Sequence, residues 1–123
     1  MDTVRANHIT YNGPGLWHIL HRMAYNANNP HNKSLFQEFL LVFQQALTCQ
    51  VCLLEFTTFL QQHPLDEYDN ILYENYDIGY FKWSVDLHNH VNTKLTKPLV
   101  SLTAAYKYYT TQHHNCKSCI KLE

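Results

Sequence analysis

Four cysteines arranged as two Cys-x-x-Cys pairs are the residues of this chain best suited to chemistry. Cys49 and Cys52 form the first pair, and Cys116 and Cys119 form the second, close to the end of the 123 residues. The opening residues lack the basic and then apolar order of a secretory signal, and paired thiols in a reducing compartment are seldom structural disulfides. We therefore expect metal ligands or redox-active thiols.

The first pair has the spacing of a dithiol that exchanges with other thiols. On a loop-entropy model, a disulfide that closes this short loop stabilises by about 2 kcal/mol, whereas a link across about 65 residues from Cys52 to Cys116 gives about 4 kcal/mol. A structural disulfide would therefore favour the longer link. Unpaired backbone N–H groups at a helix start favour a thiolate, so we expect a lowered thiol pKa at this pair. The plain alternative is two reduced cysteines without a role.

The second pair lies among polar residues and two histidines, His113 and His114, in a segment that we interpret as a mobile tail over 112–123. A mobile dithiol would suit a shuttle that carries oxidising equivalents from the first pair to a client protein. Two alternatives stay open: incidental thiols, or a non-enzymatic interaction module in which both pairs or the adjacent histidines bind zinc. Residues 53–115 separate the pairs, far more than the roughly 15–20 residues of a compact zinc site.

A third group of residues has the character of a slot for a planar ring. His88 and Asn92 are four residues apart and share one helix face, and Trp17 and His21 have the same spacing in an earlier segment. Flat aromatic and amide side chains, with lysines nearby for phosphate, suit a planar ligand. Each residue taken singly also has an ordinary explanation as packed core. The other members of this group are Trp83, Lys94 and Lys97.

Helical periodicity predicts the elements that must position these groups. Ser34 and Gln37 fit a capping box, and we find neither alternating strand patterns nor two-residue hairpin signals. The prediction is an all-α four-helix bundle plus a short fifth helix. The expected helices span 15–27, 35–48, 50–62, 78–95 and Leu102–Tyr109, with an ordered connection at 63–76, a flexible leader at 1–12, one domain at 13–111 and the tail at 112–123.

Composition argues against several classes of function. The chain is 46% hydrophobic and 15% charged with a formal net charge of −1, so it has no basic stripe for nucleic acid. No apolar run approaches the roughly 18 residues of a membrane span. We expect a soluble intracellular protein that binds neither nucleic acid nor membrane. A thioredoxin-like reductase is disfavoured because no βαβ pattern surrounds the cysteines.

Three motifs occur together in a characteristic order over about residues 13–100. They are Gly13-Pro14-x-x-Trp17-x-x-Leu20-His21, then Cys49-x-x-Cys52, then Trp83 followed by His88-Asn89-x-Val91-Asn92-x-Lys94-Leu95-x-Lys97-Pro98. In order and spacing the chain resembles the Erv/ALR sulfhydryl oxidases, and it looks most like the versions encoded by large DNA viruses. The run around His88 is specific, whereas the Cys-x-x-Cys motif alone is not.

The resemblance implies a helical bundle that holds FAD non-covalently within the bundle, usually as a homodimer. It implies an enzyme that oxidises the dithiols of client proteins, a thioredoxin-like carrier among them, and passes the electrons to molecular oxygen to give hydrogen peroxide. Cys52 would lie against the flavin, Cys49 would exchange with the incoming thiol, and Cys116 and Cys119 would act as the shuttle. The implied cofactor-binding residues are Gly13, Trp17, His21, Trp83, His88, Asn89, Val91, Asn92, Lys94, Leu95 and Lys97.

The chain departs from the family pattern at three places. Pro14 stands where many cellular members have arginine, which puts a phosphate or partner contact in doubt. Val85 and Ser101 stand near the positions of two cysteines that many members join as a structural disulfide. We therefore expect stability to come from packing, bound FAD and the dimer. The expected location is intracellular: the host cytoplasm, a virus factory or a virion if the source is viral.

Overall fold

The computed structural model describes residues 15–111. The predicted leader, Gly13, Pro14, the two tail histidines and the second cysteine pair lie outside the described residues. The elements are a helix over 15–26, then α2 (Pro30–Ala46), α3 (Gln50–Gln62), the 3₁₀ helix η1 (Leu65–Tyr68), β1 (Leu72–Tyr73), β2 (Tyr76–Asp77), α4 (Gly79–Lys94) and α5 (Leu102–Thr111).

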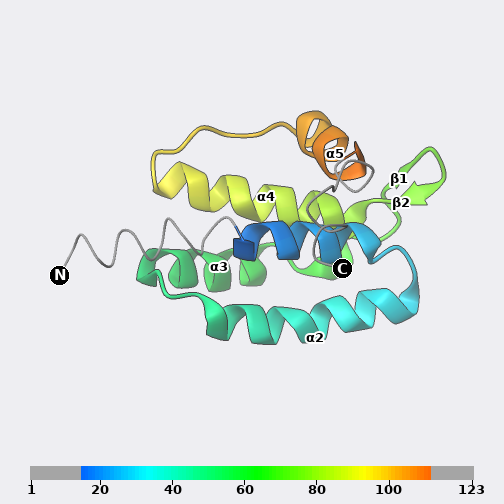
Figure 1. Ribbon diagram of the computed structural model, residues 1–123. Coiled ribbons are helices and arrows are strands. Elements are labelled where there is room, and N and C mark those ends of the chain that lie inside the picture. Colours follow the sequence, from blue (N-terminus) through cyan, green and yellow to red (C-terminus); the bar gives the residue numbers. More distant parts are fainter. Residues whose placement is uncertain (1–14, 112–123) are drawn as a thin grey trace, which may run out of the picture.

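Helices dominate the described chain, and the predicted all-α bundle with a shorter fifth helix is confirmed. The helix over 15–26, α2, α3 and α4 form a layered bundle, and α5 crosses its α4 side (Figure 1). The small hairpin of β1 and β2 projects from the end opposite the start of α3 (Figure 1). No helix within 15–111 combines the length and apolarity that a bilayer crossing needs.

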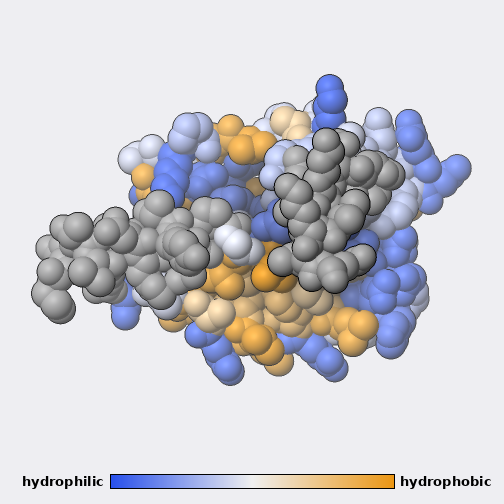
Figure 2. Space-filling model, in the orientation of Figure 1, coloured by the Kyte–Doolittle hydropathy of each residue, from blue (hydrophilic) through white to orange (hydrophobic). Residues whose placement is uncertain are grey.

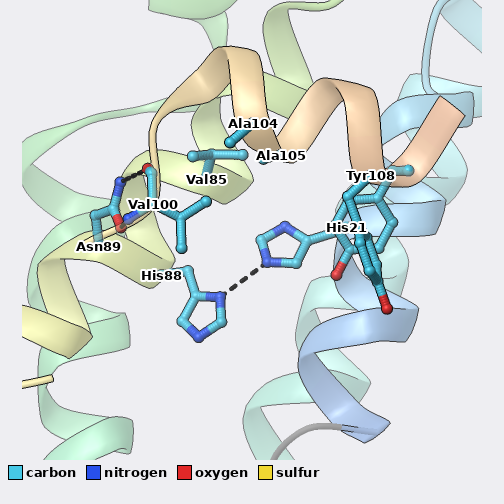
Figure 3. Close-up of a pocket in the computed structure, with 9 residues that line it drawn as sticks. His21, Val85, His88, Asn89, Val100, Ala104, Ala105 and Tyr108 are labelled. Atoms are coloured by element: carbon cyan, nitrogen blue, oxygen red, sulfur yellow. Dashed lines mark hydrogen bonds between the residues drawn. The ribbon is translucent and has the colours of Figure 1, made fainter. Parts of the chain in front are cut away.

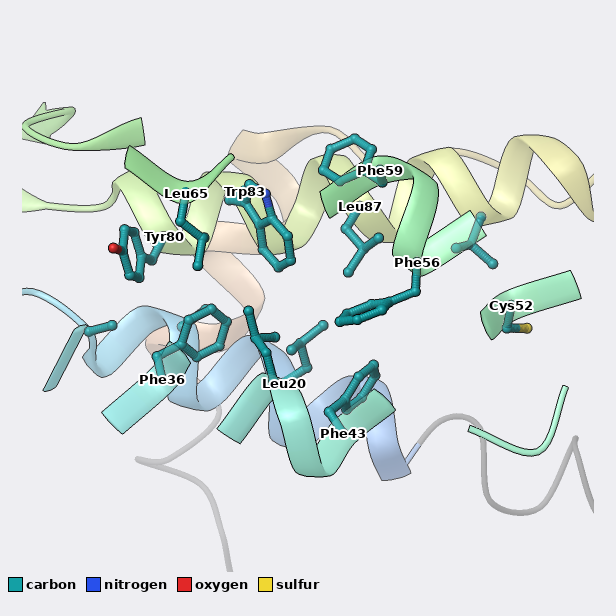
Figure 4. Close-up of a cluster of buried hydrophobic side chains, with 14 residues drawn as sticks. Leu20, Phe36, Phe43, Cys52, Phe56, Phe59, Leu65, Tyr80, Trp83 and Leu87 are labelled. Atoms are coloured by element: carbon teal, nitrogen blue, oxygen red, sulfur yellow. The ribbon is translucent and has the colours of Figure 1, made fainter. Parts of the chain in front are cut away.

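One aromatic core joins the four bundle helices (Figure 4). Trp83 of α4 is fully buried and meets Phe36 of α2 edge to face, with 6.1 Å between the ring centroids. Its indole N–H donates to the backbone oxygen of His63 at 2.8 Å, which satisfies the polar atom that burial would otherwise penalise. Phe43 and Phe56 continue the contact between α2 and α3. This core fixes the relative positions of the helices that carry the candidate site.

The start of α2 differs from the prediction. The helix begins at Pro30, and Asn29 is its N-cap, with its side chain accepting from the N–H of Asn32 at 2.9 Å. The predicted capping box of Ser34 and Gln37 is therefore wrong. Proline is favourable at the first helical position, where its missing N–H would have no partner in any case, so Asn29-Pro30 begins a helix here.

A short antiparallel hairpin is present where no strand was expected. Its register pairs Leu72 with Asp77 and Tyr73 with Tyr76. The two-residue turn between the strands has positive φ at Glu74 and at Asn75, the backbone of a type I′ turn. The prediction failed because this turn is usually built from Asn-Gly or Asp-Gly, and the Glu-Asn pair gives no such signal.

The last helix and the chain leading into it are attached to α4 by packing and by hydrogen bonds between the Asn89 side chain and the backbone of Val100. Val85 is buried with Ala105 of α5 in a second apolar cluster that also contains Ile78 and Phe81. The amide of Asn89 donates to the backbone oxygen of Val100 at 2.7 Å and accepts from its N–H at 2.9 Å. Many Erv/ALR members have a disulfide near Val85. In this chain α4 and α5 are joined there by non-covalent contacts.

Candidate active site

The first cysteine pair lies at the start of α3. Cys49 is the N-cap, and its sulfur accepts from the backbone N–H of Cys52 at 3.2 Å. Both side chains are free thiols in the structure, Cys49 partly exposed and Cys52 buried with 7% of its surface accessible. The predicted position of the dithiol at a helix start is confirmed by this cap. An incoming thiol would meet Cys49 first because Cys49 is the more accessible sulfur.

The expected lowering of the thiol pKa is wrong for Cys52. Burial raises the pKa of Cys52 well above its ordinary value, and the sulfur of Cys49 beside it raises that pKa further. The positive charge of Lys97 acts in the opposite direction and lowers the pKa of Cys52. Desolvation of the anion therefore outweighs the favourable helix start in the reduced dithiol.

Aromatic rings from three helices meet around Trp17. Trp17 and His88 stack with 3.9 Å between their ring centroids and 5° between their planes. Trp17 also contacts Phe43, at 5.7 Å between centroids. Cys52 belongs to the buried core against which Trp17 and Cys49 pack, so the dithiol and the stacked rings share one core. The fold thus brings together residues that the sequence analysis had grouped separately.

A chain of hydrogen bonds runs behind the stacked rings. The Nδ1 atom of His21 lies 2.9 Å from the hydroxyl of Ser84, and its Nε2 lies 2.9 Å from Nδ1 of His88. Burial lowers the pKa of His21 to about 3, and the nearby His88 and His18 lower it further. Burial and the charge of Lys97 lower the pKa of His88 to about 4. Both rings are therefore neutral at pH 7.

A cavity of about 350 Å³ opens beside the two histidines (Figure 3). Its walls come from the helix over 15–26, α4, α5 and the chain leading into α5. The surface is largely apolar and aromatic, with a few polar groups, which is the usual character of a small-molecule site. The lining residues are His21, Val85, His88, Asn89, Val100, Ala104, Ala105, Tyr108 and Tyr109.

Asn89 and Asn92 position the backbone after α4. Asn89 pairs with Val100 through the two hydrogen bonds given above, and the amide of Asn92 lies 3.4 Å from the oxygen of Pro98. The backbone N–H of Lys97 donates to the oxygen of Asn92 at 2.8 Å, which closes the helix and sets the start of the Lys97 side chain. The two amides thus fix the backbone that follows Lys97.

Four other predicted cofactor-binding residues lie at different depths. Trp83 and Val91 are buried in the main core, and Leu95 packs against it. Lys94 is exposed in the last turn of α4. None of these four lines the 350 Å³ cavity. Of the predicted cofactor-binding residues, His21, His88 and Asn89 line it.

Sequence reasoning missed the part of the site that comes from Ser84 and α5. Ser84 is fully buried, and a polar residue between Trp83 and Val85 on a buried helix was the one signal available. Tyr108 and Tyr109 line the cavity together with Ala104. The tyrosine-rich character of α5 was visible in the sequence, but tyrosines on a terminal helix are equally typical of a packed surface.

The residues present fit a flavin dinucleotide. A stacked indole and imidazole match a planar ring, the apolar cavity matches an aromatic base, and Lys97 matches a phosphate or an anionic ring. Within the described residues no three His, Cys, Asp or Glu side chains cluster in a way that could hold a metal ion.

The fold and the site define a small helical-bundle protein with a dithiol at a helix start on its aromatic core and a cavity beside a pair of histidines. The chain belongs to the Erv1/Alr family, whose model matches residues 14–113. It is 29% identical over 92 residues to proteins named FAD-linked sulfhydryl oxidase from two isolates of African swine fever virus, Pig/Kenya/KEN-50/1950 and Tick/Malawi/Lil 20-1/1983. Each match covers 72% of this chain and 71% of the relative. No solved structure gives a significant match.

Proposed function

We propose that this protein is an FAD-linked thiol oxidase that forms disulfides in client proteins. The observation that carries the proposal is a dithiol at a helix start that shares one aromatic core with Trp17, whose ring stacks on His88. Family membership and the printed names of the viral relatives support the same activity. Bound FAD would accept two electrons from a dithiol and pass them to molecular oxygen, which yields hydrogen peroxide.

The cysteines divide the exchange chemistry by their accessibility. A client thiolate attacks the sulfur of Cys49 in the Cys49–Cys52 disulfide, the bond between the two sulfurs breaks, and Cys52 leaves as a thiolate. The second client thiolate then displaces Cys49, so the client gains a disulfide and the enzyme pair gains two electrons. Lys97 favours the thiolate of Cys52 against the cost of burial. Trp17, His21 and His88 would hold the planar part of the cofactor.

Oxygen uptake with dithiothreitol tests the assignment of Cys52. The purified protein is expected to be yellow and to consume oxygen, and Cys52→Ser is expected to abolish turnover because the electrons no longer reach the cofactor. Ser34→Ala, an exposed change on α2, serves as the control with full turnover. Full turnover by Cys52→Ser would overturn the proposed mechanism. A colourless protein that binds stoichiometric zinc and unfolds with a chelator would support the interaction module instead.

Cys116 and Cys119 are proposed as a shuttle between the client and the first pair. This proposal rests on their spacing and on the resemblance, because both lie outside the described residues. Cys116→Ser is expected to leave turnover of dithiothreitol unchanged and to slow turnover of a reduced protein substrate. An equal loss on both substrates would contradict the shuttle.

A further inference from the structure

Ser84 is buried on α4 and contacts His21 rather than either cysteine. Its hydroxyl determines which ring nitrogen of each histidine carries the proton. The hydroxyl donates to the backbone oxygen of Phe81 at 2.6 Å, and a carbonyl oxygen can only accept. A serine has one hydroxyl proton, so Ser84 must accept in its contact with His21. The Nδ1 atom of His21 therefore carries a proton.

The protonation of His21 in turn fixes which nitrogen of His88 carries a proton. Because His21 is buried with 4% of its surface exposed and is neutral, its Nε2 has no proton and accepts from Nδ1–H of His88 at 2.9 Å. His88 is neutral as well, so its own Nε2 is left with a free lone pair. Figure 3 shows the bond between the rings, with the second nitrogen of His88 on the far edge of the ring from His21.

We propose that Ser84 is a positioning residue that fixes the tautomers of His21 and His88 and so makes Nε2 of His88 a hydrogen-bond acceptor for the bound ligand. The acceptor selects a ligand group that donates, such as the amino, imide or hydroxyl groups that FAD carries. Within the described residues Nε2 of His88 has no hydrogen-bond partner, and the ring borders the 350 Å³ cavity. The ligand part of this inference rests on the proposed function, whereas the tautomers do not depend on it.

In the variant Ser84→Ala, donor and acceptor are expected to exchange roles in the hydrogen bond between His21 and His88. Without the hydroxyl, Nδ1–H of His21 loses its acceptor, and the ring is free to carry its proton on Nε2. That nitrogen then donates to Nδ1 of His88, and His88 must carry its proton on Nε2. His88 would then present a donor where the native protein presents an acceptor, and a donating ligand group would lose its partner.

Long-range ¹H–¹⁵N spectra of the histidine rings test the tautomers directly in the full chain. The native protein is expected to show Nδ1-protonated tautomers at both His21 and His88. Ser84→Ala is expected to move both protons to Nε2, and Ser84→Thr, which keeps the hydroxyl, is expected to preserve the native pattern. Ser34→Ala on the exposed face of α2 is the matched control. Nε2-protonated rings in the native protein would overturn the proposal even if Ser84→Ala fails to fold.

Titration with FAD, followed by quenching of flavin fluorescence, tests the acceptor. Ser84→Ala is expected to bind FAD about tenfold more weakly, the effect of one hydrogen bond. Ser84→Thr is expected to retain the native affinity. Switched tautomers with unchanged affinity would overturn the acceptor role of His88. If the native protein binds no FAD, the proposed function is contradicted. The spectra would still decide whether Ser84 sets the tautomers.

Discussion

At the scale of single residues, burial determines the charge state of the site. Cys52 and the pair of His21 and His88 are all shifted toward their neutral forms because the bundle excludes water from them. Lys97 is the charged group that acts on both the cysteine and His88. These three buried groups are therefore uncharged at pH 7, which suits the aromatic part of an organic ligand.

The two histidines predict how stability depends on pH. Their pKa values fall from 6.5 to about 3 for His21 and about 4 for His88 in the folded chain, so the unfolded chain binds more protons below pH 6.5. Stability is complete above pH 6.5 and falls as the pH is lowered toward these values, by up to about 1.4 kcal/mol per pH unit for each ring. Urea unfolding of the cofactor-free protein between pH 7 and 4.5 measures this slope.

The exposed His31 provides a comparison for that slope. His31→Gln removes a histidine from the surface of α2 and leaves the buried pair intact. A urea concentration at half-unfolding that stays constant between pH 7 and 4.5 in the native protein would contradict the assignment of two neutral buried rings.

The sequence was sufficient to identify most residues of the candidate site but not their electrostatics. Motif spacing selected Cys49, Cys52, Trp17 and the histidines, since helical spacing fixes which side chains share a face. The pKa of Cys52 was predicted in the wrong direction, because the degree of burial depends on contacts between α3 and the rest of the bundle. Ser84 was missed for the same reason: its partners are 3 and 63 positions away along the chain.

At the scale of elements, the start of α4 depends on the absence of a side chain at Gly79. A Cβ at this position would lie 1.7 Å from the backbone oxygen of Tyr68, so η1 and α4 would have to separate. Gly79→Ala is expected to destabilise the protein by at least about 3 kcal/mol, because backbone atoms cannot move aside as a side chain does. Thermal unfolding measures the effect.

Gly15→Ala is the matched control, because a Cβ there meets no atom within 4 Å. This change is expected to be neutral or slightly stabilising, since alanine is the better helix former. Equal unfolding temperatures for both variants would show that η1 and α4 do not approach as closely as the structure has them.

The backbone just after α4 is strained at Thr96. Thr96 has a φ of 56°, in the left-handed region that glycine adopts readily and that a β-branched residue rarely does. The backbone N–H groups of Thr96 and Lys97 close the helix by donating to the oxygens of Thr93 and Asn92. Thr96→Gly is expected to stabilise the protein by about 0.5–1 kcal/mol, measured by urea unfolding.

Thr93→Gly tests whether the gain is specific to that backbone conformation. Thr93 lies inside α4, where glycine costs about 1 kcal/mol of stability. Opposite signs for the two variants are expected, and a loss of stability in both would contradict strain at Thr96.

The helices were predictable, whereas the connections depended on local chemistry that the patterns did not resolve. Helix 50–62 and the last two helices were placed within two residues, because their apolar positions recur at helical spacing. The start of α2 was placed five residues late, because the predicted start relied on the capping box of Ser34 and Gln37. The β1–β2 turn uses Glu74 and Asn75 without glycine, so propensity gave no indication of it.

At the scale of the whole molecule, the outer face of α2 is unusually apolar for a surface helix. Leu41 and Val42 are 65% and 61% exposed, and a cavity of about 330 Å³ opens beside Leu41 between α2 and the α3–η1 region. Figure 2 shows hydrophobic surface gathered over this part of the molecule. Contiguous exposed apolar surface is typical of an interface.

We propose that a second copy of the chain covers this face, because the Erv/ALR resemblance implies a homodimer. The native protein is then expected to sediment at twice the mass of the chain, and Leu41→Glu is expected to shift it to the monomer, because a carboxylate cannot be buried there unpaired. Leu72→Glu is the matched control, since Leu72 is 63% exposed on β1, far from α2 in Figure 1.

The mass and the thermal stability of these variants should change together. Residues near the family's structural disulfide positions are joined here by packing and hydrogen bonds alone, so a covered α2 face would supply stability that a monomer lacks. Leu41→Glu is therefore expected to unfold at a lower temperature, and the native protein is expected to gain stability as its concentration rises. A native protein that sediments as a monomer, with an unfolding temperature independent of concentration, would rule out the dimer.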